Sequence, residues 1–148
     1  RPSHTYGPHF TGSDNRVFCQ FIRNVLRGED IVMKSDGSQM RSWCYVADCA
    51  LAMLYVLLNG ERGNAYNIAD TSSVFSIREM AETLAHQAGR KVVFAIPEDV
   101  EKKVFTKISY AVFATDKLEA LGWKPLAGNW QQKLKTTIRE EMEKTDLG

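Results

Sequence analysis

Excess charge of either sign is missing from this sequence of 148 residues, in which 19 Lys and Arg residues and 18 Asp and Glu residues leave a net charge of +1. Such a balance gives no electrostatic reason to expect nucleic acid or an anionic membrane surface as a partner. Long apolar runs are missing as well, because the longest, residues 50–58, has about half the length that crosses a bilayer. We therefore expect neither nucleic acid nor a membrane as a partner.

Cysteine and histidine are scarce. The three cysteines lie in apolar segments, and neither they nor the three histidines have the spacing of zinc ligands. These residues are Cys19, Cys44, Cys49, His4, His9 and His86. The odd cysteine count argues against a disulfide framework. We predict reduced core thiols in a cytoplasmic protein, and no metal site.

Motifs that supply a complete catalytic centre are also missing. The sequence contains no Gly-x-Gly-x-x-Gly, no phosphate-binding loop ending in Gly-Lys-Ser/Thr, and no Gly-x-Ser-x-Gly. No tyrosine is followed four residues later by lysine. The chain as it stands is therefore not expected to carry out catalysis by itself.

What is present is an alternation of helical and strand patterns, with a hydrophobic content of 44% that is enough for a core. Helical spacing is found over 15–27, 77–88, 116–121 and from about residue 130, and short apolar runs predict strands at 31–33, 41–46, 65–68 and 91–96. Residues 50–58 are apolar nearly all round, which predicts a helix that other structure covers. This alternation favours an α/β fold.

Several polar residues and glycines mark the predicted helix ends. Ser13 or Asp14 is expected to cap the first helix, and Gly28 follows its end. Asp48 is expected to cap the helix over 50–58. Residues 76–79 have the Ser-x-x-Glu spacing of a capping box.

Four polar residues stand at the edges of apolar segments and are candidates for binding an anion. Arg41 begins a strand, Arg16 begins a helix, Lys34 ends a strand, and Asn67 interrupts an apolar run. Arg41 and Arg16 could close on a diphosphate, because a guanidinium presents a planar fork of donors that matches phosphate oxygens.

Structural roles for the two arginines are the alternative. Arg41 could pair with Asp36 or Asp48 instead of a ligand. Arg16 could be a solvated residue of the first helical turn, although a cation is unfavourable at a helix N-terminus.

Four motifs occur in order along the chain: HTYGP at 4–8, GSQMRSW at 37–43 with YVAD at 45–48, YNI at 66–68, and LGWKP at 121–125. In this order they resemble the NAD-dependent epimerase/dehydratase family, the extended short-chain dehydrogenases that act on nucleotide sugars. The resemblance implies a small mixed α/β substrate-binding domain. Residues 1–8 would be a remnant of the last Rossmann strand with its Tyr-Gly-Pro turn, and residues 9–148 the nucleotide-sugar-binding domain, with the Rossmann core missing.

The resemblance also implies roles for individual residues. Arg41 matches the arginine that contacts the diphosphate of the nucleotide sugar, and Asn67 matches an asparagine near the nucleotide. The strand residues Val32, Met33 and Lys34 match those that lie along the base.

Residues of the N-terminal part would lie near the sugar and the cofactor. Arg16 falls where related enzymes place a basic residue over the substrate, and Ser3 falls where the chain passes the nicotinamide. His4 stands where many members have an asparagine that binds the substrate phosphate. Ser42 replaces the usual aspartate after the arginine, and residues 97–100 lack the arginine of a loop that often closes on the nucleotide.

The function that the resemblance implies is substrate binding within an NAD-dependent nucleotide-sugar epimerase or dehydratase, with residues 14–17 most like the UDP-glucuronate decarboxylase branch. The full-length parent would bind NAD and form a homodimer. The fragment would bind a UDP- or dTDP-sugar without NAD, show no turnover and self-associate through apolar surface. The alternatives are a non-catalytic nucleotide-sugar sensor or scaffold that kept the fold, and a purely structural α/β module.

Overall fold

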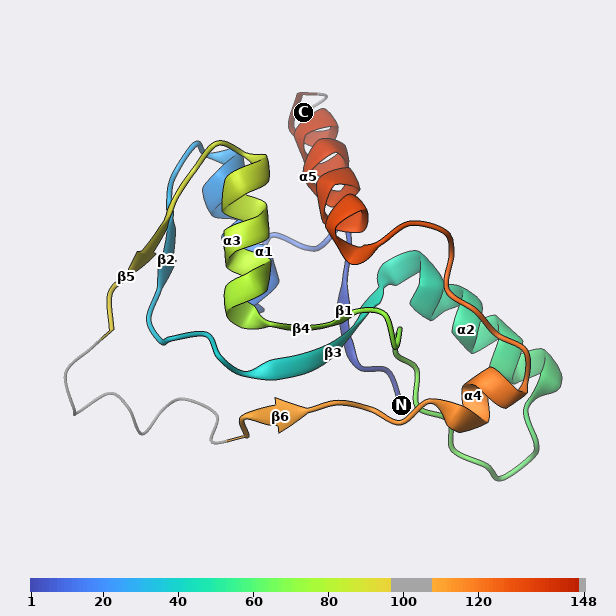
Figure 1. Cartoon of the computed structure of the whole chain (residues 1–148). Coiled ribbons are helices and arrows are strands. Elements are labelled where there is room, and N and C mark those ends of the chain that lie inside the picture. The colour runs from blue at the N-terminus through green and yellow to red at the C-terminus, as the bar shows by residue number, and fades with distance from the viewer. Residues whose placement is uncertain (97–107, 147–148) are drawn as a thin grey trace.

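Strand β3 (Met40–Tyr45) is the centre of the larger of two sheets in the computed structural model, which describes residues 1–96 and 108–146 (Figure 1). Its second half pairs in parallel with β1 (His4–Tyr6), and its first half pairs antiparallel with β4 (Val74–Ser76). The short strand β6 (Tyr110–Ala111) joins the first residues of β3 in parallel. β3 therefore links the N-terminal strand to β6, which comes about 70 residues after β3 in the chain.

The smaller sheet consists of β2 (Ile31–Met33) and β5 (Val92–Phe94), which pair in parallel. Both strands lie within ranges that the sequence predicts, although β5 is shorter than the predicted 91–96. With the helices described below, the two sheets form the mixed α/β fold that the sequence predicts.

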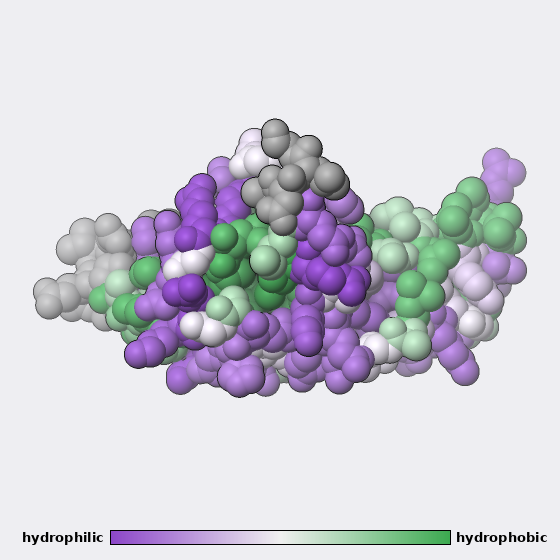
Figure 2. Space-filling view, turned by 90° about the horizontal axis from the view of Figure 1, so that it is seen from above, coloured by the Kyte–Doolittle hydropathy of each residue, from purple (hydrophilic) through white to green (hydrophobic). Residues whose placement is uncertain are grey.

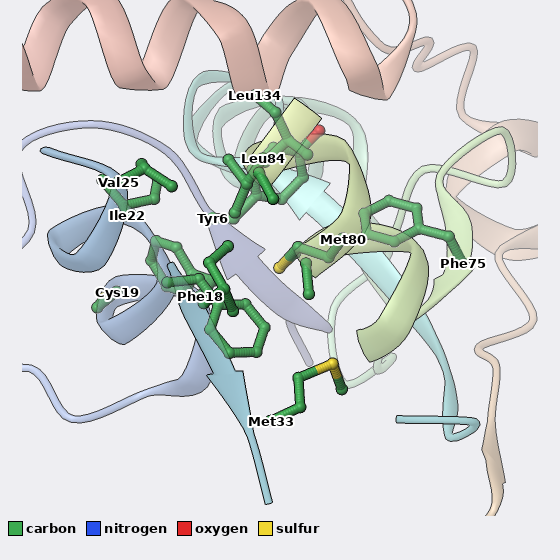
Figure 3. Close-up of a cluster of buried hydrophobic side chains, with 14 of the residues drawn as sticks. Tyr6, Phe18, Cys19, Ile22, Val25, Met33, Phe75, Met80, Leu84 and Leu134 are labelled. Carbon is green, nitrogen blue, oxygen red and sulfur yellow. The ribbon is translucent and has the colours of Figure 1, made fainter. Parts of the chain in front are cut away.

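Three helices pack around the main core, namely α1 (Val17–Leu26), α3 (Ile77–Gln87) and α5 (Trp130–Asp146). Figure 3 shows that their apolar side chains meet those of β1, β2 and β4. The aromatic rings of Trp43, Phe75 and Trp130 stack in sequence, with centroid separations of 5.3 Å and 4.1 Å. The Trp43 indole N–H donates to the Phe75 carbonyl at 3.0 Å, which satisfies its one polar atom within this core.

Two predicted helix signals are confirmed in detail. Ser76 caps α3 through a complete capping box, in which its hydroxyl accepts from the backbone N–H of Glu79 and its own N–H donates to the Glu79 carboxylate. Gly28 follows α1 with a φ of +72°, the left-handed conformation that favours glycine. Helix α4 (Asp116–Ala120) is also followed by a left-handed glycine, Gly122.

Other boundaries differ from the prediction. Helix α1 begins at Val17 and its N-cap position is Arg16, without a side-chain cap, so neither Ser13 nor Asp14 caps it. Asp14 instead accepts a hydrogen bond from the backbone N–H of Arg16, because an Asx turn forms just before the helix. The segment 65–68 is not a strand, since it forms a single bridge, from Ile68 to Pro2.

Asp48 is not the cap of the next helix, α2 (Val46–Asn59), because β3 runs directly into that helix and Tyr45 takes the N-cap position. Asp48 lies fully buried in the first turn, where its carboxylate meets the Lys133 ammonium at 2.7 Å. The same ammonium lies 3.5 Å from the buried carboxylate of Asp70. The backbone N–H of Leu126 donates to the second Asp48 oxygen at 2.7 Å. One buried cation thus joins α2, α5 and the segment after residue 68.

Asp70 is held in its ionised form by further donors. Burial opposes its ionisation, but hydrogen bonds from Ser72 and Ser73, together with the charge of Lys133, outweigh burial and lower the pKa of Asp70. The group of Asp48, Asp70 and Lys133 is referred to below as the buried ion triad.

Helix α2 is less covered than its apolar sequence predicts. The side chains of Leu57 and Leu58 are 77% and 80% exposed, and further apolar residues of the same helix are exposed with them, namely Leu51, Met53, Leu54 and Tyr55. Figure 2 shows this apolar surface at the right-hand end of the molecule. The helix therefore presents an apolar face that no described residue covers. No helix in the described ranges is long and apolar enough to cross a membrane.

Cys19, Cys44 and Cys49 are all buried, as the sequence predicts, and none forms a disulfide. Burial raises the pKa of the Cys19 thiol to about 12. Burial also raises the pKa of the Cys44 thiol, so Cys19 and Cys44 are core thiols with little thiolate character at neutral pH.

Candidate functional site

A pocket of about 590 Å³ lies between α1, β2, the first residues of β3 and the segment around β6. Its wall combines apolar side chains with a few polar and cationic ones. The lining residues are His4, Val17, Gln20, Phe21, Val32, Met33, Lys34, Ser35, Gln39, Arg41, Ile77, Ile108 and Ala111. Five of the seven residues predicted to bind substrate meet in this one pocket.

Arg41 is the most buried charge in the pocket wall, with 7% of the residue exposed. Its guanidinium donates to two backbone carbonyls, those of Met40 and Ile108, both at 2.8 Å. Because a guanidinium has five N–H donors, further donors remain for a ligand.

Neither of the two carboxylates that could have paired with Arg41 does so. Asp36 accepts hydrogen bonds from Ser38, and Asp48 belongs to the buried ion triad. Within residues 1–96 and 108–146, no carboxylate forms an ion pair with Arg41. A buried cation without a counter-ion is costly, so the pocket is suited to an anionic ligand.

His4 lies beside Arg41, on the neighbouring strand. Its ring is 5.3 Å from the Trp43 ring, centroid to centroid, and tilted against it. Partial burial of the ring, and then the charges of Arg41 and Arg16, lower the pKa of His4 below its ordinary value. His4 is therefore a neutral hydrogen-bonding group in the pocket at neutral pH.

The end of β2 forms another wall of the pocket. Met33 is buried in the core, while Val32 and Lys34 are exposed. This wall is apolar and has a single cation at its end, which suits a flat ring with a charged group nearby.

Arg16 lies outside the residues that line the pocket. Its guanidinium forms an ion pair of 2.6 Å with Asp14, donates to the Thr5 carbonyl at 2.9 Å, and lies 4.8 Å from the centre of the Phe18 ring. Hydrogen bonds from Arg16 lower the pKa of Asp14. Arg16 and Arg41 therefore do not line one pocket together, although Arg16 is close enough to His4 to lower its pKa.

Asn67 also lies outside the pocket lining. It forms a hydrogen bond with the segment 108–114, part of which lines the pocket. Its side-chain amide donates to the Ala114 carbonyl at 2.9 Å. The hydroxyl of Ser42 accepts from the backbone N–H of Phe113 at 2.8 Å. Together with the contact between Arg41 and Ile108, these bonds hold residues 108–114 across β3.

The sequence did not identify this role of residues 108–114. No motif or apolar alternation marks Ile108 or Ala111 as pocket residues, and their contact with β3 joins residues about 70 positions apart. The apolar residues Phe21 and Ile77 lie in ranges for which the sequence predicted only a helix. Residues 97–100, where the sequence lacks the expected arginine, lie outside the described residues.

Ser3 is the residue expected at the nicotinamide. Its backbone N–H donates to the Ile68 carbonyl at 2.8 Å, whereas its hydroxyl is buried and has no hydrogen-bond partner among the described residues. A buried hydroxyl without a partner fits a position that another group completes. The 148 residues contain no glycine-rich loop for the cofactor's diphosphate, so Ser3 could only be one edge of a cofactor site.

Comparison with known proteins shows which family the chain is similar to. Residues 1–69 match the model of the "NAD dependent epimerase/dehydratase family". Among curated proteins, UDP-glucuronic acid decarboxylase 6 of Arabidopsis thaliana is 34% identical over 82% of this chain and 34% of its own length. The mouse dTDP-D-glucose 4,6-dehydratase is 28% identical over 93% of this chain and 39% of its own length. The chain thus spans about a third of the length of the curated relatives that it matches.

Solved structures share the fold over nearly the whole chain. A dTDP-glucose 4,6-dehydratase from Streptomyces venezuelae, solved with NAD and TYD bound, superposes with a TM-score of 0.82 at 22% identity and covers 99% of this chain and 44% of its own. A UDP-glucose 4-epimerase from Thermotoga maritima, solved with UDP-glucose, has a TM-score of 0.78 at 23% identity, over 100% of this chain and 46% of its own.

Proposed function

This chain belongs to the NAD-dependent epimerase/dehydratase family, and on that premise we propose that it is the substrate-binding part of an enzyme that modifies nucleotide sugars. The observation that supports the proposal most strongly is the buried Arg41 guanidinium, which lines an apolar pocket and has no carboxylate partner in the described ranges. A nucleoside diphosphate would provide the counter-ion for Arg41 and a flat base for the apolar wall, because it joins a base to an anion.

In this proposal the diphosphate lies against Arg41 and His4, and the base lies along Val32, Met33 and Lys34. Asn67 and Ser42 hold residues 108–114 in place over the pocket, which keeps water from the bound diphosphate. Arg16, tied to Asp14, lies at the outer edge and contributes positive potential near the sugar.

NAD would be bound largely by residues that the 148-residue sequence does not contain, with the free hydroxyl of Ser3 at its edge. When bound, NAD would supply the hydride acceptor that oxidises the sugar and later returns the hydride. The contribution of this chain is to bind and orient the sugar nucleotide. The 34% identity to a UDP-glucuronic acid decarboxylase supports UDP-glucuronate as the substrate. We also propose that the full-length enzyme is a homodimer and is located in the cytoplasm.

A non-catalytic nucleotide-sugar sensor is the second candidate. It is favoured by the absence of a glycine-rich loop and of a Tyr-x-x-x-Lys pair from the 148 residues. Both motifs in the upstream gene sequence would favour the enzyme, and their absence there would favour the sensor.

Calorimetric titration of the 148-residue chain with UDP-glucose tests the proposal. We expect saturable binding, no binding of uridine, and no product by chromatography after incubation with UDP-glucose or UDP-glucuronate and NAD. Binding is expected because the pocket is present, and turnover is not, because the cofactor loop and the Tyr/Lys pair are missing. A product peak, or a flat titration with UDP-glucose, would contradict the proposal.

We also propose that the chain self-associates through the apolar face of α2. Leu57 and Leu58 are exposed to an extent that is costly for a helix in water. Light scattering at increasing concentration should show oligomers that Leu57→Glu with Leu58→Lys disperses. Asn59→Glu, which changes the charge of the same helix without removing apolar surface, is the control. A monomer at every concentration would count against this surface.

A further inference from the structure

His4 shares the wall of the pocket with Arg41. The two residues lie on the paired strands β1 and β3, and the register places His4 beside Trp43, two residues after Arg41. The contact with the Trp43 ring holds the imidazole at the pocket wall. A neutral imidazole offers one N–H donor, whereas a protonated imidazole offers two donors and a positive charge.

Within residues 1–96 and 108–146, the charges that act on His4 are positive. Arg41 faces it from β3, Arg16 faces it from the start of α1, and Lys34 lines the same pocket from the end of β2. The carboxylate of Asp14 forms the 2.6 Å ion pair with Arg16. In the pocket without a ligand, a proton on His4 would add one more cation to a site that already holds an excess of them.

A bound diphosphate reverses this balance, because it brings negative charge next to Arg41. We propose that His4 is a proton-linked anion-binding residue, neutral in the free pocket and protonated when a nucleoside diphosphate lies beside Arg41. The proton comes from solvent and adds to the free ring nitrogen, which then donates to a phosphate oxygen. This inference rests on the proposed function and adds that ligand binding takes up a proton.

The direction of the pH dependence follows from the two states. Partial burial and then the two arginines keep the pKa of His4 below its ordinary value in the free protein, and the bound anion raises it. Between these two pKa values the complex holds more protons than the free protein, so affinity rises as pH falls. The rise for a single proton is at most about tenfold per pH unit, and it is confined to the range between the His4 pKa of the free protein and that of the complex.

The test uses UDP-glucose, whose doubly esterified diphosphate does not itself titrate near neutral pH. Carbon-labelled histidine, followed by NMR between pH 5.5 and 8, should show the His4 ring titrating at higher pH in the complex than in the free protein. His9 and His86, which do not line the pocket, are internal references and should be unchanged. Calorimetry should show tighter binding at pH 6 than at pH 8, with proton uptake that disappears in His4→Asn.

The results distinguish a failure of the proton-linked role of His4 from a failure of the proposed function. If UDP-glucose binds but His4 titrates identically with and without it, and the His4→Asn variant keeps the same pH dependence, the proton-linked role is wrong while the proposed function stands. If UDP-glucose fails to bind at any of these pH values, the proposed function and the role of His4 are both wrong.

Discussion

Lys133→Met should lower the free energy of unfolding by about 3–5 kcal/mol, because it leaves two carboxylates buried without their cation. Asp48 and Asp70 are 0% and 1% exposed, and both lie within 3.5 Å of the Lys133 ammonium. Urea denaturation followed by circular dichroism measures the change. Lys135→Met, an exposed position on the same helix, should change stability by no more than about 0.5 kcal/mol.

The pH dependence identifies the cause of this loss. Asp70 has a lowered pKa in the folded protein, so the stability that it contributes is present above the ordinary carboxyl pKa and is lost as pH falls through its lowered value. Without Lys133 the carboxylates are uncompensated only when ionised, so the difference between wild type and variant should shrink toward pH 4. A loss that is equal at pH 7 and pH 4 would indicate lost packing and contradict the electrostatic explanation.

Arg41→Ala should weaken UDP-glucose binding by about 2–4 kcal/mol, as expected when one partner of a desolvated, charge-assisted pair is removed. Stability should fall by about 1 kcal/mol, because the guanidinium also donates to the Ile108 carbonyl. Arg41→Lys should recover part of the affinity, since a point charge cannot reproduce a two-pronged contact with phosphate. Calorimetric titration and thermal denaturation of the same samples measure both effects.

Arg139→Ala is the matched control, because Arg139 lies on the exposed side of α5 and pairs with Glu143. It should leave the affinity for UDP-glucose unchanged. Unaltered affinity in Arg41→Ala together with a large loss of stability would show that Arg41 is a structural residue that holds residues 108–114.

The elements that the sequence predicted well are those specified by local patterns. Helix α3 follows from its capping box, and α1 follows from its apolar spacing and from the left-handed Gly28. Strands β4 and β6 were missed. The three-residue strand β2 could be predicted because all its residues are apolar, whereas β4 ends in Ser76 and β6 has only two residues. Their pairing is specified by their neighbour β3 and not by their own sequence.

The predicted site shows the same division between local and distant interactions. The pocket brings together His4, Arg41 and the end of β2, which the motifs had singled out. The role of Asp48 was misread because its partner Lys133 is 85 residues away. The partner of Arg16, Asp14, is two residues away, and this local pair draws its guanidinium away from the pocket. The roles of Asp48 and Arg16 depend on contacts that form only in the folded chain. Such contacts are not visible in the sequence pattern, and so these roles could not be predicted.

A crystal structure of the protein with UDP-glucose tests the central claim most directly. We predict diphosphate oxygens within hydrogen-bond distance of the Arg41 guanidinium, with the uracil ring beside Val32, Met33 and Lys34 and the contact from Arg41 to Ile108 retained. A sugar nucleotide ordered at any other place on the molecule, with Arg41 bonded to the Met40 and Ile108 carbonyls alone, would contradict the claim that this pocket binds the substrate.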